Sequence, residues 1–324
     1  MINFIVNKLL LSLPPETAHQ VALTLLRLTY RIRTPKKIIS PCTLMGIEFP
    51  NPVGLAAGMD KNGDYIDALA SLGFGFIEIG TVTPRPQRGN PKPRLFRLAK
   101  EQAIINRMGF NNKGVDYCVE KIRKAKFKGV LGVNIGKNAD TPLESATDDY
   151  LTCFRRVAPF ASYVTLNISS PNTASLRNLQ HGKLLTHLLR ILKQEQAIQK
   201  KYVPLVVKIS PDLTRDEFRE MADIFLMEKI DGVIATNTTL NRSEVDQSIY
   251  ANESGGLSGR PLRARSTQII KLLHELLQEK IPLIGCGGIF SREDVEEKMR
   301  VGASLVQVYS GLVFQDPKKI MGIR

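Results

Sequence analysis

The sequence predicts an α/β fold, namely a (β/α)8 TIM barrel with an N-terminal two-helix amphipathic extension. From residue 51 onward, short apolar segments with strand character alternate with longer amphipathic segments. Eight such pairs follow one another, which is the number that closes a parallel barrel. The strand segments are almost continuously apolar, as expected for parallel strands that are covered on both faces.

The eight predicted strands are Pro52–Gly58, Gly75–Gly80, Val130–Ile135, Tyr163–Ile168, Pro204–Ile209, Gly232–Ala235, Pro282–Gly285 and Ser304–Val308. Helix-like segments follow them, around residues 63–72, 114–126, 144–157, 183–200, 215–228, 262–279, 291–300 and, more briefly, after Pro317. A doubly wound open sheet is the competing architecture, but it requires a nucleotide-binding crevice, and the sequence has no G-x-G-x-x-G motif. The run Gly132–Lys137 is one residue short of a P-loop and lacks the Ser or Thr that follows the lysine.

Two insertions interrupt the predicted barrel. Residues 83–112 are rich in Pro, Arg and Gly and are expected to form a small hairpin cap from Leu95–Ala99 and Ala103–Asn106. Residues 239–259 end in Gly255–Gly259, which is expected to be a flexible loop that leads into a helix. Long loops on the catalytic rim of a barrel usually act as lids or binding loops.

Residues 1–40 differ from the rest and are predicted to form a separate helical domain, with the barrel domain at 41–324. A short helix near Phe4–Leu10 is expected to end at the Pro14-Pro15 pair, and Pro15 and Glu16 suit the first turn of a second helix. The apolar residues of that second helix follow the spacing of one helix face: Ala18, Val21, Ala22, Leu25 and Leu26. Such helices either pack on the main domain or lie in a membrane interface.

The composition limits the function classes. The chain has 324 residues, a formal net charge of +14 and 6% aromatic residues, without a recognition-helix, zinc-finger or RNP pattern, so no nucleic-acid partner is expected. Its four cysteines lie far apart, which predicts neither a disulfide framework nor a zinc site. The sequence has no run of 18 apolar residues, so it predicts no membrane-spanning helix. The basic excess suits small anionic ligands and an anionic membrane surface.

Polar residues and glycines follow the predicted strands, and the carboxyl ends of barrel strands meet on one face. These residues are Gly58 with Lys61, Thr81, Asn134, Asn167 with Ser170 and Asn172, Lys208, Thr236 with Asn237 and Thr238, Gly287 with Gly288, and Tyr309 with Ser310. None of the four histidines is among them, so a zinc site is not predicted. Asp60 is the only acid near a strand end, which does not make a carboxylate pair.

Each part of this rim has a chemical meaning. Asparagine offers both a donor and an acceptor, so several asparagines match a ring edge of alternating N–H and C=O groups, such as a pyrimidine dione. Lys208 ends a buried strand, where a charge is costly unless it meets an anion. The glycines after the last two strands lie where barrels commonly bind a phosphate through backbone N–H groups.

At this point the sequence resembles the dihydroorotate dehydrogenase family, in particular its class 2, quinone-linked branch. The resemblance covers nearly the whole chain. It rests on the motifs Asn51–Lys61, Ile79–Gln87, Asn106–Asn111, Asn167–Asn172, Ala235–Thr239, Gly255–Leu262 and Gly287–Ile289.

The resemblance implies bound FMN, which is reduced as dihydroorotate is oxidised to orotate in de novo pyrimidine biosynthesis. It implies FMN contacts from Ala57, Gly58, Lys61, Thr81, Asn134, Asn167, Lys208, Thr236, Gly259, Gly288, Tyr309 and Ser310. It implies substrate contacts from Lys61, Asn106, Arg107, Met108, Gly109, Phe110, Asn167, Asn172, Asn237 and Thr238. The family's catalytic base falls on Ser170, whose own proton would leave along a water chain past Thr173.

The resemblance also implies that electrons leave for a membrane quinone that enters between the two N-terminal helices, with His19, Arg97 and Tyr309 as candidate contacts. The protein would then be peripheral, on the cytoplasmic side of the cell membrane. Class 1 relatives carry cysteine where this chain has Ser170, so the serine favours class 2. Two alternatives stay open: a soluble class 1-like enzyme that uses fumarate or NAD, and a barrel that binds a phosphate ligand without redox chemistry.

Overall fold

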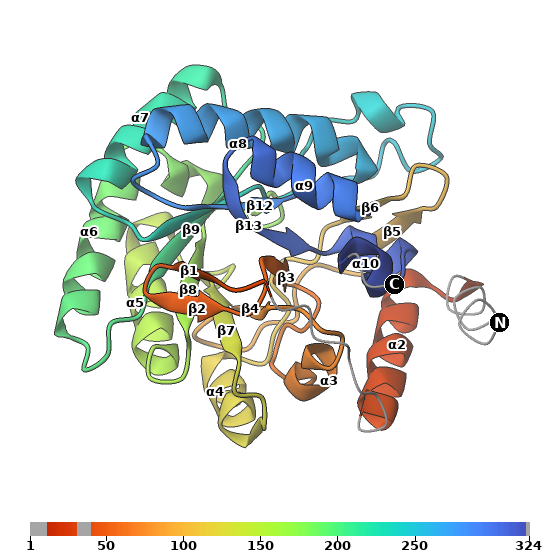
Figure 1. Ribbon diagram of the computed structural model, residues 1–324, viewed down its shortest axis with the longest axis horizontal. Coiled ribbons are helices and arrows are strands. Elements are labelled where there is room, and N and C mark those ends of the chain that lie inside the picture. The colour runs from red at the N-terminus through yellow and green to blue at the C-terminus, as the bar shows by residue number, and fades with distance from the viewer. Residues whose placement is uncertain (1–11, 31–39, 322–324) are drawn as a thin grey trace.

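The protein is a closed parallel barrel with helices around it, as the alternation predicts (Figure 1). The computed structural model describes residues 12–30 and 40–321. The barrel strands, in their order around the barrel, are β3 (Val53–Leu55), β4 (Phe76–Val82), β7 (Val130–Ile135), β8 (Tyr163–Asn167), β9 (Leu205–Ile209), β10 (Gly232–Ala235), β12 (Leu283–Cys286) and β13 (Ala303–Val308). All neighbours pair in parallel, and β13 returns to β3 to close the barrel.

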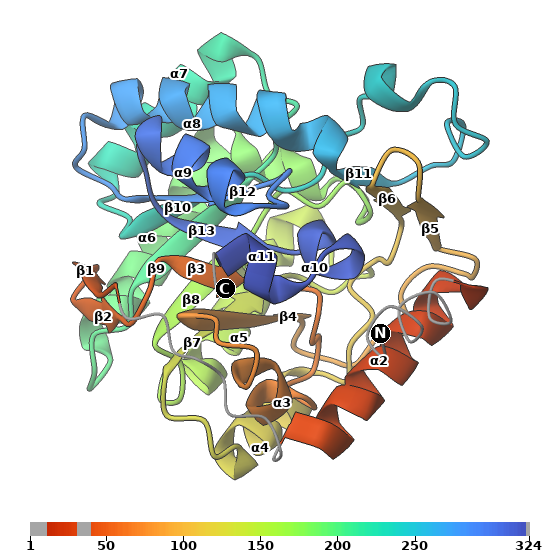
Figure 2. The same cartoon turned by 45° about the vertical axis from the view of Figure 1, so that its right-hand side comes forward.

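The helices lie on the outside of the barrel, where their buried faces cover the strands (Figures 1 and 2). They are α3 (Ile66–Ala70), α4 (Val115–Lys124), α5 (Ala146–Val157), α6 (Gly182–Ile198), α7 (Arg215–Met227), α8 (Arg263–Leu277), α9 (Arg292–Arg300), α10 (Ser310–Phe314) and α11 (Pro317–Met321). Short 3-10 turns add η2 (Leu143–Ser145), η3 (Leu176–Gln180), η4 (Ser243–Val245) and η5 (Arg260–Leu262). Capping boxes led by Thr214 and Ser291 satisfy free N–H groups at the starts of α7 and α9.

A hairpin that the sequence analysis did not predict packs against the interior of the barrel. It consists of β1 (Cys42–Leu44) and β2 (Ile47–Phe49). Phe49 is fully buried and meets the ring of Phe76 edge to face, with 5.3 Å between the ring centroids. The hairpin's apolar side chains join the cluster that fills the barrel at its amino-terminal end, so the opposite end is left for the site.

The predicted cap is confirmed, but one of its parts was wrongly predicted. β5 (Leu95–Leu98) and β6 (Ala103–Asn106) form the expected hairpin. The segment expected as a flexible loop is instead strand β11 (Gly256–Gly259), which pairs antiparallel with β6. Its glycine content argued for a loop, yet glycine is what lets this strand approach β6 closely: a Cβ on Gly259 would lie 2.4 Å from the Gln102 carbonyl oxygen. The cap is therefore a three-stranded sheet.

Helix α2 (Pro15–Thr29) confirms the second predicted helix, and it lies beside α3 and β5 (Figures 1 and 2). The predicted helix near Phe4–Leu10 lies outside the described residues. The apolar residues of α2 are unevenly buried: Ala18 and Leu23 are buried, whereas Val21, Leu25 and Leu28 are exposed. Val21, Leu25 and Leu28 are four and three positions apart, so they form an apolar stripe on the outer side of α2 that no described residue covers.

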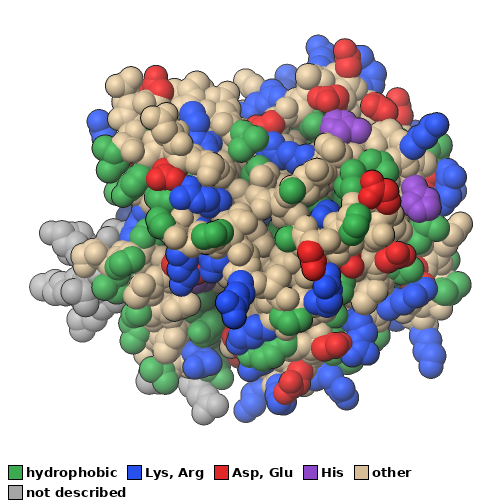
Figure 3. Space-filling view, turned by 180° about the vertical axis from the view of Figure 1, so that it is seen from behind, with side chains coloured by type: hydrophobic (Ala, Val, Ile, Leu, Met, Phe, Trp, Pro, Cys, Tyr) green, Lys and Arg blue, Asp and Glu red, His purple; other side chains and the backbone are tan. Residues whose placement is uncertain are grey.

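Charge is spread over the surface rather than gathered in one patch on the face in Figure 3, where acidic side chains lie among the basic ones. Within residues 12–30 and 40–321, no helix is both long and apolar enough to cross a membrane.

Candidate active site

A cavity of about 1010 Å³ opens at the carboxyl ends of the barrel strands, beneath the cap. Its lining contains most of the residues that the strand-end pattern and the resemblance singled out: Ala57, Gly58, Lys61, Thr81, Asn106, Met108, Gly109, Phe110, Asn167, Ser170, Asn172, Lys208, Thr236, Asn237, Thr238, Gly259, Gly288, Tyr309 and Ser310. These residues come from every barrel strand end except that of β7, and from the cap. The tertiary structure thus brings scattered residues into one site.

Four predicted site residues do not line this cavity. Asn134 is fully buried behind the lining and contacts it through side-chain hydrogen bonds. Arg107 pairs with Glu253 and stacks over the ring of Phe96, with its guanidinium carbon 4.6 Å from the ring centroid. His19 and Arg97 lie nearer to the N-terminal segment, as described below.

The polar floor of the cavity is one connected amide network. Asn167 Nδ2 donates to Thr81 Oγ1 at 3.0 Å and to Asn134 Oδ1 at 3.2 Å. Thr81 Oγ1 donates to the same Asn134 oxygen at 2.5 Å. On the other side, Asn237 Nδ2 donates to Asn167 Oδ1 at 3.1 Å. Each amide is therefore held in one orientation by its neighbours.

Beneath this floor lies Glu78, which the sequence analysis did not single out. Its carboxylate is fully buried and accepts hydrogen bonds from four side chains: Asn134 Nδ2 at 2.8 Å, Tyr163 OH at 2.9 Å, Thr165 Oγ1 at 3.1 Å and Gln307 Nε2 at 2.7 Å. The Glu78 carboxyl accepts the hydrogen bond from Asn134 Nδ2. It therefore fixes the Asn134 amide with its nitrogen downward and its oxygen toward Thr81 and Asn167, which sets the donor and acceptor order of the floor.

Lys208 confirms the expectation of a buried charge at the end of a strand. Its side chain lines the cavity and the residue is 6% exposed. Among the described residues, none accepts a hydrogen bond from its ammonium or pairs with it. A buried ammonium is costly without an acceptor, so the cavity is suited to a ligand that brings acceptor or anionic atoms to this point.

Lys61 and His19 form the electrostatic link between the cavity and α2. Burial lowers the pKa of the Lys61 ammonium to about 8, and its Nζ donates to the Gly58 carbonyl at 3.0 Å. Burial and the charge of Lys61 lower the pKa of the His19 imidazole to about 4. His19 also hydrogen-bonds the backbone of Met59. A neutral imidazole thus lies within electrostatic reach of a lysine that lines the cavity.

The cap and α2 are joined by arginines. Arg94 Nη2 lies 2.7 Å from Glu16 Oε1, and the two side chains are 8% and 18% exposed. Arg97 Nη2 donates to the Leu13 carbonyl at 2.8 Å. Tyr309 lies at the cavity wall, where burial raises its pKa to about 12, so it stays a phenol at neutral pH. Of the three quinone candidates, His19 and Arg97 therefore lie between α2 and the barrel, and Tyr309 lines the cavity.

Ser170 is 6% exposed and accepts a hydrogen bond from the Asn172 backbone N–H at 3.2 Å. Asn172 Nδ2 in turn donates to Asn106 Oδ1 at 3.2 Å, which ties the loop after β8 to the cap. Thr173 Oγ1 is buried and has no hydrogen-bond partner among the described residues. No acid or histidine contacts the Ser170 hydroxyl among those residues.

Asp60, the acid near a strand end, has a structural role. Its two carboxylate oxygens accept hydrogen bonds from the backbone N–H groups of Asn62, Gly63, Asp64 and Tyr65. Burial raises the pKa of this carboxyl, and the four N–H groups satisfy it. It therefore shapes the turn that presents Lys61 rather than taking part in proton transfer.

Glycines keep one side of the cavity free of side chains. Gly288 has φ +73°, and a Cβ there would lie 2.4 Å from Arg263 Cα at the start of α8. Only glycine allows the loop after β12 to lie this close to α8. Lining residues that the sequence analysis missed include Ala56, Ser258, Leu262, Cys286 and Gln307. Ser258 belongs to the strand that had been expected as a loop, and its Oγ lies 2.8 Å from Ser310 Oγ.

The comparisons with known proteins agree with this geometry. The family model described as dihydroorotate dehydrogenase matches residues 41–324. The chain belongs to the dihydroorotate dehydrogenase family. A relative from Acinetobacter baylyi named dihydroorotate dehydrogenase (quinone) is 55% identical over 326 residues, covering 99% of this chain and 98% of that protein. One of the same name from Chromobacterium violaceum is 55% identical, covering 99% and 96%.

Solved structures of the family share the fold. The ligand-free DHODH from Eimeria tenella is 39% identical and superposes with a TM-score of 0.90, covering 95% of this chain and 92% of that chain. The DHODH from the same organism in complex with ferulenol is 38% identical, with a TM-score of 0.87 and coverages of 95% and 89%. The resemblance noted in the motifs is thereby confirmed for the family and for the barrel.

In the described part of the chain, no group of three or more His, Cys, Asp or Glu side chains is placed to hold a metal ion.

Proposed function

We propose that this chain oxidises dihydroorotate to orotate in de novo pyrimidine biosynthesis, with FMN as its cofactor and a quinone as the electron acceptor. Membership of the family supports the reaction, and the similarity to relatives named as quinone-dependent supports the acceptor. The single observation that carries the proposal is the buried ammonium of Lys208, which lies beside a fixed amide floor and has no partner among residues 12–30 and 40–321.

FMN fits the residues present. A flavin ring brings acceptor atoms toward an ammonium, and a single phosphate suits the side-chain-free wall at Gly288. The residues that would hold it are Ala57, Gly58, Lys61, Thr81, Asn134, Asn167, Lys208, Thr236, Gly259, Gly288, Tyr309 and Ser310, with Asn134 acting through Thr81 and Asn167. When bound, FMN supplies the hydride acceptor and the route to the quinone. Lys208 would stabilise negative charge on the part of the bound FMN that lies beside its ammonium.

The substrate's ring would meet donors and acceptors that the chain already orients. Asn106, Asn167, Asn172, Asn237 and Thr238 offer amide and hydroxyl groups around one volume. Lys61 and the segment Asn106–Phe110, which includes Arg107, Met108 and Gly109, complete the proposed substrate contacts. The positive charge of Lys61 suits the substrate's carboxylate. Dihydroorotate loses a hydride from one ring carbon and a proton from its neighbour, which yields orotate.

Ser170 is the proposed base for that proton. It lines the cavity and lies on the loop that also carries Asn172. A serine hydroxyl needs an exit for its own proton, because it is a weak base. Thr173 Oγ1, buried and without a partner among the described residues, is suited to carry the proton onward through water.

Residues 1–40 are proposed to be the quinone-access and membrane-contacting domain, and residues 41–324 the catalytic barrel. His19 and Arg97 lie at the boundary between α2 and the barrel, and Tyr309 faces the cavity, which supports all three as quinone contacts. The exposed stripe of Val21, Leu25 and Leu28 supports peripheral contact with an anionic membrane on its cytoplasmic side.

The test is to release the flavin from the purified protein and identify it by mass, then to mix the holoenzyme anaerobically with dihydroorotate. The expected result is FMN that is bleached by dihydroorotate and reoxidised by a lipophilic quinone, but not by fumarate or NAD. FAD, no flavin after expression with ample riboflavin, or a flavin that dihydroorotate does not reduce would overturn the proposal.

A further inference from the structure

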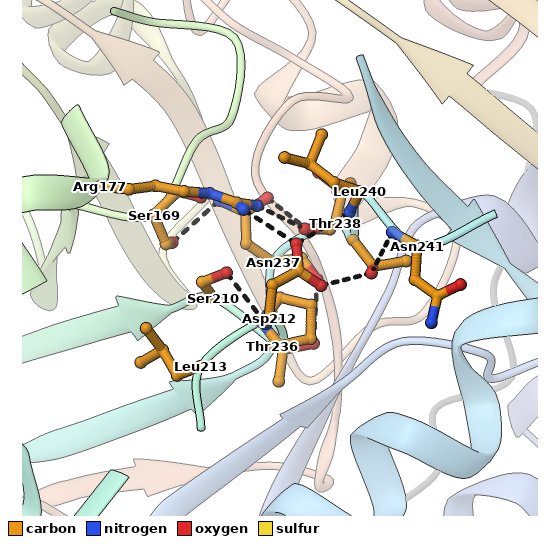
Figure 4. A network of polar contacts seen from close by, with 12 residues as sticks. Ser169, Arg177, Ser210, Asp212, Leu213, Thr236, Asn237, Thr238, Leu240 and Asn241 are labelled. Atoms are coloured by element: carbon orange, nitrogen blue, oxygen red, sulfur yellow. Dashed lines mark hydrogen bonds and ion pairs between the residues drawn. The ribbon is translucent and has the colours of Figure 1, made fainter. Parts of the chain in front are cut away.

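A polar network just outside the cavity joins three loops, two of which carry proposed site residues (Figure 4). Arg177 lies on η3, seven residues after Ser170 in the chain. Its guanidinium points back under the loop after β8: Nε donates to the Ser169 carbonyl at 3.2 Å. Nη2 donates to the Thr238 carbonyl at 3.1 Å, and Nη1 to Asp212 Oδ2 at 2.8 Å. One side chain thus connects the segments that follow β8, β9 and β10.

Asp212 extends the connection along the segment after β10. Its Oδ2 also accepts the Leu240 backbone N–H at 2.8 Å, and its Oδ1 accepts the Thr239 hydroxyl. The side chains of Arg177 and Asp212 are 21% and 23% exposed, so water screens this ion pair only in part. Hydrogen bonds between charged partners are roughly twice as strong as neutral ones.

The segment after β10 is open to solvent on its outer side. A second hollow of about 1670 Å³ lies beside it and is lined by Thr239, Leu240 and Asn241 as well as Asp212. Leu240 is 50% exposed and Ile249, further along the same insertion, is 90% exposed. The segment is held on its inner side by the Thr239–Leu257 bridge, whose two backbone hydrogen bonds are 3.0 and 2.8 Å long. Arg177 and Asp212 add charged hydrogen bonds to this bridge.

Neither Arg177 nor Asp212 lines the main cavity, but each contacts the loops that do. Arg177 contacts Ser169, which precedes Ser170, and Thr238, which lines the cavity. Asp212 contacts Thr239, which follows Thr238. On the same side, Asn237 Nδ2 donates to Ser169 Oγ at 3.0 Å. The Ser170 loop and the Thr238 loop are therefore joined by the Arg177 guanidinium and by the Asn237 amide.

We infer that Arg177 and Asp212 are positioning residues for the proposed reaction, which hold Ser170 and Thr238 at the separation that proton removal from the substrate requires. The inference rests on the proposed function. Arginine is needed because three donors in one plane serve three acceptors, which a lysine ammonium cannot span with the same geometry. Misplacement of a reacting group by 1 Å can cost about a hundredfold in rate.

The experiment compares Arg177→Ala, Arg177→Lys and Asp212→Asn holoenzymes with the unchanged protein in anaerobic stopped-flow reduction of the flavin by dihydroorotate. The rate at saturating substrate is expected to fall by about tenfold to a hundredfold in Arg177→Ala, with flavin content retained and a smaller loss for the other two. Arg190→Ala is the matched control, because Arg190 pairs at 2.9 Å with Glu228, the residue after α7, away from the cavity, and the rate of this variant should be unchanged.

The decisive measurement adds Arg177→Ala to Ser170→Ala. If Arg177 acts through Ser170, it costs little in that background, because residues that act as a unit are not additive. An equal loss in both backgrounds, or an Arg177→Ala rate within about twofold of the unchanged protein, overturns the inference. Should Arg177→Ala not fold, the same two criteria apply to Asp212→Asn. Failure of the unchanged holoenzyme to react with dihydroorotate would instead overturn the proposed function, so the two failures are distinguishable.

Discussion

The floor of the cavity and helix α2 are attached to the barrel in different ways. On the floor, Glu78 is fully buried and accepts four hydrogen bonds, so a change in any partner is passed to the amides above it. Helix α2 reaches the cap through the Glu16–Arg94 pair and leaves Val21, Leu25 and Leu28 exposed. A floor with one arrangement suits recognition of a small rigid ring. A helix with an apolar outer stripe suits contact with an apolar partner outside the described residues, such as the proposed membrane.

This contrast assigns the two halves of the proposed catalytic cycle to two regions. Oxidation of dihydroorotate would depend on the barrel alone, whereas transfer of electrons to quinone would depend on the N-terminal segment as well. At saturating dihydroorotate, changes in each region should therefore affect the rate of one half-reaction and spare that of the other.

The largest effect is expected at the floor and its rim. Ser170→Ala removes the proposed base while leaving the amide network in place, so flavin and substrate should still bind. Flavin reduction by dihydroorotate should slow by about 10²–10⁴-fold, the usual contribution of a positioned base. Anaerobic single-turnover stopped-flow measures this rate. A loss of less than tenfold would place the base elsewhere.

The next effect concerns the N-terminal segment. Deletion of residues 1–40 should lower the rate of flavin reoxidation by a lipophilic quinone at least about tenfold, or about 1.4 kcal/mol in activation free energy. The rate of flavin reduction at saturating dihydroorotate should not change, because the deletion leaves the cavity lining intact. Both half-reactions are followed by flavin absorbance. A folded, flavin-loaded truncation that reduces quinone at the full rate would refute the access assignment.

The same segment offers a milder variant for the membrane. Leu25→Ser and Leu28→Ser keep the helix but remove exposed apolar side chains, and should weaken sedimentation with anionic vesicles in a partly salt-sensitive way. Leu184→Ser is the matched control, since Leu184 is a similarly exposed leucine at the start of α6. Equal sedimentation of all three variants would contradict the membrane contact.

The smallest effect links the two regions. Lys61 must be protonated to attract the substrate's carboxylate, so affinity for dihydroorotate should fall as the pH rises through the Lys61 pKa of about 8. The negative charge of Glu16 raises that pKa. Glu16→Gln should therefore move the fall in affinity to lower pH, by less than about one unit, or 1.4 kcal/mol. Substrate titrations of the oxidised holoenzyme across this pH range measure the shift.

Glu120→Gln is the control for charge alone, because Glu120 is an exposed partner of Lys124 on α4. It should leave the pH dependence where it is. An unchanged profile in Glu16→Gln would show that α2 does not influence the substrate site electrostatically.

By itself, the sequence determined the barrel and most of its rim. The alternation of strand and helix segments is a local pattern, and the polar residue after each strand is visible without knowing what it faces. The sequence alone therefore places Asn167, Ser170, Lys208 and Thr238 together, because the carboxyl ends of barrel strands must converge. The motifs then added the family.

Only the tertiary structure decided which polar groups became partners. Glu78 lies within an apolar run, and its partners Asn134 and Gln307 are 56 and 229 positions away in the chain. The glycine-rich segment Gly256–Gly259 became a strand because β6 offered it an open edge, against its local composition. Arg177 acquired its three acceptors from three different loops. Periodicity shows which face of a segment is buried, but a hydrogen bond between distant residues depends on where the closed barrel brings each strand end.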